Sequence, residues 1–123
     1  MRSTRNHRPE ELLPLTAVAF EIALALMDGE RHGYAIMQAV EAQTAGAMSL
    51  HPGTLYRALA RLADAGVLEE LDERPAGEAD DERRRYFRLT AWGRQVAAAE
   101  AKRLEAQVRA ARGKRLLPHT GRA

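Results

Sequence analysis

Apolar and polar positions along this chain predict four helices and one β-hairpin. Residues 14–27 are apolar on almost every side, a pattern typical of a helix that is buried on more than one face. A second helix is expected over residues 33–44, a very short strand over residues 48–50, and a third helix over residues 52–66. The apolar ridge of the third helix consists of Leu55, Leu59, Leu62 and Gly66.

The second half of the chain predicts a β-hairpin and then one long helix. Residues 67–73 and 83–89 have the alternation of strands, and residues 74–82 combine a proline, a glycine and acidic residues as hairpin tips do. Thr90 is the expected N-cap of a helix over residues 91–112, which would be about 33 Å long at 1.5 Å per residue. A core of this size cannot cover so long a helix, so a second subunit is expected to cover it.

Helix, turn, helix, strand, hairpin tip and strand is the order of a winged helix-turn-helix domain. The predicted fold class is therefore mainly α with a small β-hairpin, in which a winged helix-turn-helix precedes a long C-terminal dimerisation helix. Four parts are expected along the chain. They are a flexible N-terminal tail over residues 1–11, the winged helix-turn-helix over residues 12–90, the dimerisation helix over residues 91–112 and a flexible tail over residues 113–123.

Composition narrows the class of protein. The chain has 123 residues, a formal net charge of +2 and no cysteine, which excludes a disulfide framework and a thiolate metal site. Its longest apolar run is about 13 residues, shorter than a membrane span, and no signal peptide is visible, so a cytoplasmic protein is expected. The histidines lack metal-ligand spacing and no nucleophile–base pair is present, so no metal, cofactor or enzymatic activity is expected.

The third helix carries the residues expected to read DNA. With the leucine ridge turned to the core, Arg57 and Arg61 fall on the opposite half of a helical wheel, together with Thr54. The early residues of the second helix of a helix-turn-helix meet base edges in the major groove. We therefore expect Thr54, Arg57 and His51 near base edges. Arg61 is one turn deeper and can equally meet the backbone, while Tyr56 at the flank can pack its ring and direct its hydroxyl to a phosphate.

Two further segments supply candidate DNA contacts. His32 and Tyr34 open the second helix, where backbone N–H groups bind phosphate readily, although Tyr34 can equally pack against the third helix. Arg83, Arg84 and Arg85 lie at the base of the wing and can place charge on a flanking minor groove or its phosphates. The acidic wing tip would repel DNA, so we expect it to project past the duplex. Without this arginine triplet, the arginines of the third helix would indicate only a solvent-exposed helix surface.

The expected dimer interface has two parts. On the first helix, Val18 and Ile22 repeat at helical spacing on a surface too apolar for one small core to cover. On the last helix one apolar stripe passes into another, and the residues of both are Trp92, Val96, Ala99, Arg103, Leu104 and Val108. These stripes are short and rich in alanine, so paired helices can approach closely but gain little area per residue.

Three blocks of the sequence, in this order, resemble the signature blocks of the PadR family of bacterial transcriptional regulators. They are HGYAIMQAVE, PGTLYRALARLADAGVLEE and RRRYFRLTAWGR. The resemblance covers residues 15–104, which is most of the chain. The single short C-terminal helix is similar to that of the compact members of the family.

The resemblance implies a homodimeric repressor whose last helix pairs with that of its partner. Two equivalent recognition helices imply double-stranded DNA with a palindromic operator as the partner. Release by a small hydrophobic or phenolic effector, or by a stress signal, is also implied. By their positions in the motifs, Tyr34, Thr54, Tyr56 and Arg57 correspond to residues expected near DNA. The competing interpretation is a winged-helix protein-interaction module that does not read sequence, which the low net charge and the acidic wing favour.

Overall fold

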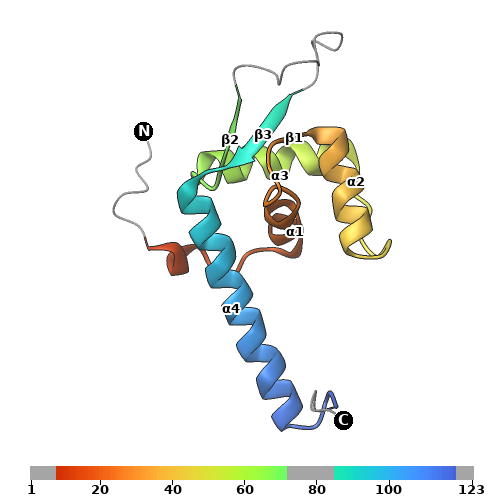
Figure 1. Cartoon of the computed structure of the whole chain (residues 1–123), viewed down its shortest axis with the longest axis vertical. Helices are drawn as coiled ribbons and strands as arrows, with labels where there is room; N and C mark the ends of the chain where they lie inside the picture. The colour runs from red at the N-terminus through yellow and green to blue at the C-terminus, as the bar shows by residue number, and fades with distance from the viewer. Residues whose placement is uncertain (1–7, 72–84, 119–123) are drawn as a thin grey trace.

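The structure is a computed structural model that describes residues 8–71 and 85–118. Figure 1 shows α1 enclosed by the other helices, with α4 running on beyond them. The small sheet lies at the opposite end from the far end of α4. The elements are η1 (Pro9–Leu12), α1 (Ala17–Ala25), β1 (Arg31–His32), α2 (Gly33–Gln43), α3 (Pro52–Asp64), β2 (Leu68–Glu70), β3 (Tyr86–Leu89) and α4 (Ala91–Gly113).

The first helix, α1, is shorter than the sequence pattern predicts, because a cap fixes its first turn. The Thr16 hydroxyl accepts a hydrogen bond from the Ala19 N–H at 3.0 Å, so the start predicted at Pro14 was wrong. The helix stops at Ala25, whose carbonyl accepts a hydrogen bond from Arg31 Nε at 2.7 Å. Arg31 thereby satisfies one of the carbonyls that a helix end leaves without an intrahelical partner.

Parts of both expected tails have a defined structure. Pro9–Leu12 forms η1, which lies against α4 (Figure 1), so the prediction of a loose tail over residues 1–11 was wrong for residues 9–11. At the other end, Arg112 Nε donates a hydrogen bond to the Pro118 carbonyl at 2.7 Å, which folds the chain back on the end of α4. Residues 1–7 and 119–123 of the two predicted tails lie outside the described residues.

The sheet has three antiparallel strands in the order β1–β3–β2, so the strand that returns from the wing lies in its middle. The prediction of a short strand at residues 48–50 was wrong. The Met48 N–H is instead bound by the Thr44 hydroxyl at 3.0 Å, within a turn that includes Gly46 at a φ of 83°. The additional strand is Arg31–His32, which pairs with β3.

The predicted hairpin is formed by β2 and β3, but both strands are shorter than the alternation suggests. They have 3 and 4 residues. The Leu71 N–H adds one hydrogen bond beyond β2 by donating to the Tyr86 carbonyl at 2.8 Å. The hairpin tip predicted over residues 74–82 lies outside the described residues.

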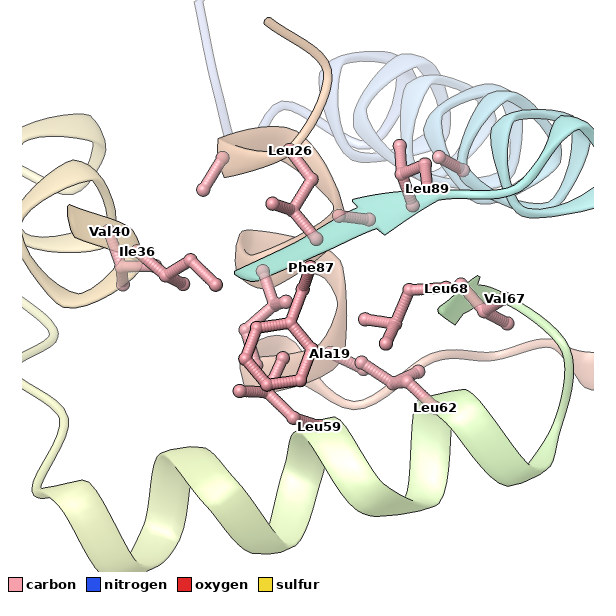
Figure 2. Close-up of a cluster of buried hydrophobic side chains, with 14 of the residues drawn as sticks. Ala19, Leu26, Ile36, Val40, Leu59, Leu62, Val67, Leu68, Phe87 and Leu89 are labelled. Carbon is pink, nitrogen blue, oxygen red and sulfur yellow. The ribbon is translucent and has the colours of Figure 1, made fainter. Parts of the chain in front are cut away.

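The core is built on the leucine ridge of α3, as predicted. Leu55, Leu59 and Leu62 are all buried, and Figure 2 shows Phe87 of β3 beside Leu59 in the same cluster. Leu68 of β2 joins them from the other strand of the hairpin. Full burial of one such side chain stabilises the fold by about 1.5–3 kcal/mol, so this ridge holds α3 with its other face turned outward.

The apolar surface of α1 is explained largely within one subunit. Ile22, Ala23 and Leu26 are buried, because α2, α3 and α4 all contact this helix. Two large apolar side chains of this segment are exposed, and they are Leu24 in the last turn of α1 and Met27 just after it. A second subunit is therefore not needed to cover most of α1.

The start of α4 is fixed against the end of α3. The Thr90 hydroxyl accepts a hydrogen bond from the Gly93 N–H at 2.9 Å and donates one to the Gly66 carbonyl at 2.6 Å. Gly93 lies so close to the Val67 carbonyl that a Cβ at this position would overlap its oxygen. These contacts place α4 directly after the hairpin and aim it away from the sheet (Figure 1).

Candidate nucleic-acid interface

The second helix of the helix-turn-helix, α3, presents its polar face to solvent. Arg57 and Arg61 are exposed and lie opposite the buried leucine ridge, as the helical wheel predicts. Within residues 8–71 and 85–118, neither arginine forms an ion pair with a carboxylate. Both guanidinium groups are thus available for an outside partner of negative charge.

The first turn of α3 is open on the same side. His51 precedes the helix as an exposed residue, and its side chain makes no capping hydrogen bond. Thr54 is half-buried. Gly53 lies beside Arg57, since a Cβ at Gly53 would be 3.4 Å from Arg57 Nη1. A small residue at this point leaves the arginine room at the helix N-terminus, where groups enter a major groove in other helix-turn-helix proteins.

His32 and Tyr34, both expected near DNA at the start of α2, lie in different environments. His32 is the N-cap: its Nδ1 accepts a hydrogen bond from the Ala35 N–H at 3.2 Å, and its ring meets that of Tyr86 edge to face at 5.4 Å. Tyr34 is 60 % exposed, so most of its surface is open to an outside partner, while packing of its ring against α3 stays a prediction. Tyr34 therefore remains the stronger candidate of the two for an outside contact.

Tyr56 is half-buried at the junction of three elements. Its hydroxyl lies against Gly33 at the first residue of α2, where an added Cβ would overlap the hydroxyl oxygen. Its ring centroid is 6.2 Å from that of Phe87 on β3. The expected packing of the ring is therefore present, while the expected phosphate contact of its hydroxyl stays a prediction.

Arg85, at the base of the wing, is held by a bidentate ion pair. Its Nε and Nη2 donate to the two carboxylate oxygens of Glu70 on β2, each at 2.9 Å. Its Cζ lies 5.1 Å from the centroid of the Tyr56 ring, a cation–π distance. The hydrogen bonds from Arg85 lower the pKa of the Glu70 carboxyl despite some desolvation, and the same hydrogen bonds raise the pKa of Arg85.

A second ion pair crosses the hairpin beside the first. Arg88 Nε donates to Glu69 Oε2 at 2.8 Å, and these residues are directly opposite in the register of β2 and β3. Each arginine in the described part of the hairpin is thus matched by a glutamate. The other two members of the predicted triplet, Arg83 and Arg84, lie outside the described residues.

The predicted dimer surface is corrected at two residues. Ile22 and Val96 are both 0 % exposed, so they belong to the core of the subunit and offer no surface to a partner. The error arises because the stripe through Val96 faces inward along the first half of α4. The remaining predicted residues keep some accessible surface, and they are Val18, Trp92, Ala99, Arg103, Leu104 and Val108.

Two residues of the candidate DNA interface were not predicted from the sequence. Glu70 was read only as part of a strand, and its pairing with Arg85 depends on the register of the hairpin. Gly33 was read as part of a helix start, although the structure needs it for the close approach of Tyr56. A glycine at the first position of a helix is the kind of signal that could have indicated such an approach.

Comparison with known proteins agrees with this architecture. The family model of the transcriptional regulator PadR-like family matches residues 23–99, which is more than half of the chain. The chain belongs to this family. This family is one of transcriptional regulators and not of enzymes.

Solved structures of similar fold include several regulators. A transcriptional regulator from Clostridium thermocellum has a TM-score of 0.66 and 24% identity, with 78% of this chain and 87% of that chain covered. A PadR family regulator from Clostridium difficile has a TM-score of 0.65 and 19% identity, with 78% and 95% covered. PadR from Bacillus subtilis, solved in complex with operator DNA, has a TM-score of 0.58 and 21% identity, with 70% and 47% covered. At these identities the likeness concerns the fold.

A curated relative is an uncharacterized 37.1 kDa protein in transposon TN4556 of Streptomyces fradiae. It is 42% identical over 80 residues, which are 65% of this PadR-like chain. The match spans only 21% of that longer protein.

In the ranges that the structure describes, no helix is both long and apolar enough to cross a membrane.

Proposed function

We propose that this PadR-like protein is a homodimeric repressor that reads a roughly palindromic operator with two copies of α3. The observation that carries this proposal is the exposed face with Arg57 and Arg61, held outward by the buried leucine ridge on the opposite side of the same helix. Arginine forms bidentate hydrogen bonds with guanine edges and phosphates. Two such faces, related by a two-fold axis, suit half-sites about one turn of DNA apart or a small multiple of it.

The proposed dimer is supported by the second half of α4. Ala97 is buried in the subunit, and from it Ala101, Leu104, Val108 and Ala111 follow at alternating spacings of four and three residues. This is the heptad spacing of helices that pair along a seam. Residues 105–110 are all exposed in the single subunit, so a partner helix has access to the seam.

Selection of DNA fragments from a random genomic pool tests the proposal. The wild-type protein, at physiological salt, is expected to enrich one inverted repeat, and light scattering is expected to give the mass of a dimer. Enrichment of no sequence would contradict operator recognition and favour the alternative of a protein-interaction module. A monomer that still binds a single half-site would contradict the dimer alone.

We also propose that the repressor acts in the cytoplasm and that a small hydrophobic or phenolic effector, or a stress signal, releases the operator. Support comes from an apolar hollow of about 240 Å³ between the segment before α1 and the inner side of α3. Leu12, Leu15 and Ala58 line it, with Arg61 at one side. A phenolic acid such as 4-hydroxybenzoic acid should then lower operator occupancy in an anisotropy titration; an unchanged titration across a panel of phenolic acids and planar aromatic drugs would contradict release by such an effector.

A further inference from the structure

Arg85 connects the strand that returns from the wing to the recognition helix. One edge of its guanidinium group, with Nε and Nη2, faces the Glu70 carboxylate, while the plane of the group covers the Tyr56 ring. Its Cζ is also 5.5 Å from the centroid of the Phe87 ring. Arg85 thus contacts β2, β3 and α3 within one subunit.

The ring of Tyr56 is the point where the DNA-facing elements meet. The hydroxyl end of Tyr56 lies against Gly33, the first residue of α2, and Arg85 lies over its ring. A shift of the wing base would therefore move Arg85 away from Tyr56. Tyr56 directly precedes Arg57 in α3, so the position of Arg57 would change with it. This chain of contacts links the base of the wing to the recognition helix.

The charges around Arg85 argue against a direct phosphate contact. Glu70 lies 2.9 Å from Arg85, and its pKa is lowered by the hydrogen bonds from Arg85, so the carboxylate stays ionised at neutral pH. A phosphate that approached Arg85 would also approach this carboxylate. Like charges at such distances repel, although water and salt screen part of the effect at this exposed site.

We propose that Arg85 is a positioning residue, which holds the wing base against Tyr56 and so fixes the wing relative to α3, and that it does not bind phosphate itself. This inference refines the sequence prediction that placed Arg85 among the DNA contacts. It rests on the operator recognition proposed above.

Salt dependence of binding separates the two roles. The logarithm of affinity falls linearly with the logarithm of salt concentration, with a slope of about 0.9 for each phosphate that the protein neutralises. Arg85→Ala is measured by fluorescence anisotropy on the inverted repeat selected by the wild-type protein, at four salt concentrations. We expect the affinity to fall about tenfold, the size of a typical coupling between contacting residues, with the slope unchanged. An unchanged affinity, or a slope reduced by about 0.9 per subunit, overturns the proposal.

Glu70→Gln gives a prediction of opposite sign for the two roles. If Arg85 bound phosphate, removal of the adjacent negative charge would strengthen binding. If Arg85 is a positioning residue, the loss of its partner weakens binding. The double variant Glu70→Gln with Arg85→Ala should then bind no worse than Arg85→Ala alone, because both changes break one interaction. Tighter binding by Glu70→Gln overturns the proposal.

Arg88→Ala is the matched control. It removes an arginine of the same strand from a similar ion pair, but alternation along β3 places Arg88 on the face of the sheet away from Phe87 and Tyr56. Its affinity should stay within about twofold of wild type, and circular dichroism should give the same unfolding curve for all variants. A tenfold loss of affinity in Arg88→Ala would show that the effect of Arg85→Ala comes only from a weakened hairpin. That result would overturn the proposal. If the wild type enriches no sequence, the proposed function is contradicted. The salt dependence of binding to a random-sequence duplex, measured for wild type and Arg85→Ala, then still decides whether Arg85 contacts phosphate.

Discussion

Glu100 and Arg103 form a bidentate ion pair on the inner face of α4, with Nε···Oε1 at 2.9 Å and Nη2···Oε2 at 2.8 Å. Only 2 % of the Glu100 side chain is exposed. The carboxylate also accepts a hydrogen bond from the backbone N–H of Leu15, so it ties α4 to the segment that leads into α1. Arg103, which the sequence assigned to the dimer interface, already has a partner within its own subunit.

This ion pair makes the stability of the fold depend on pH in the acid range. The hydrogen bonds from Arg103, and to a lesser degree from Leu15, lower the pKa of Glu100 below its ordinary value of 4.5, against the opposing effect of burial. A depressed pKa in the folded state contributes stability that is complete above the unfolded value and is lost as pH falls through the folded value. Glu100→Gln should therefore cost about 1–3 kcal/mol at pH 7 in urea unfolding, and the difference from wild type should shrink below pH 4.5.

Glu105→Gln is the control for this measurement, because Glu105 is exposed on the same helix. It should change the free energy of unfolding by less than about 0.5 kcal/mol at either pH. A Glu100→Gln variant whose deficit stays constant from pH 7 to pH 3.5 would contradict the role of the ionised carboxylate.

Gly33→Ala should weaken DNA binding as well as the fold. The added Cβ would overlap the Tyr56 hydroxyl, which is the far end of a side chain that can shift. The expected loss of stability is about 1–3 kcal/mol, and displacement of Tyr56 should in addition lower operator affinity severalfold. Anisotropy titration and thermal unfolding of the same samples check both parts. Gly113→Ala, where nothing lies within 4 Å of an added Cβ, is the control and should bind as the wild type does.

Much of the helical structure was predictable because its signals are local. Pro52 at the start of α3, the leucine ridge along it and the Thr90 cap of α4 all lie within or next to the helix that they specify. The pattern of Arg57 and Arg61 opposite the ridge follows from helix geometry alone. These features need no knowledge of the rest of the chain.

Features that depend on contacts far along the chain were missed. β1 consists of Arg31–His32 and exists only as a partner of β3, so no periodicity in two residues could indicate it. The pairing of Glu70 with Arg85 requires the register of the hairpin. The assignment of Ile22 and Val96 to a dimer interface failed because a helical stripe does not tell whether its cover comes from the same subunit or another.

Arg57→Ala should reduce both the affinity and the selectivity of operator binding. Arg57 is exposed near the N-terminal end of α3, where side chains meet base edges. Loss of a bidentate base contact costs about 1–3 kcal/mol and relaxes the preference at that base pair. Repeated selection with the variant measures the preference at each position. Lys102→Ala, which removes an exposed charge from α4, should leave it unchanged. Equal affinity and selectivity in Arg57→Ala would exclude this residue from base recognition.

Val108→Glu should separate the subunits without unfolding them. Val108 is 39% exposed on the part of α4 that runs beyond the core, so the change costs the single subunit little. In a symmetric pair of helices it would bring two carboxylates to the apolar seam, where their burial without partners is costly. Ala106→Glu adds the same charge at an exposed position on the other side of α4 and should remain a dimer. Sedimentation velocity distinguishes the two, and dimers of equal affinity in both variants would place the subunit contact elsewhere on the molecule.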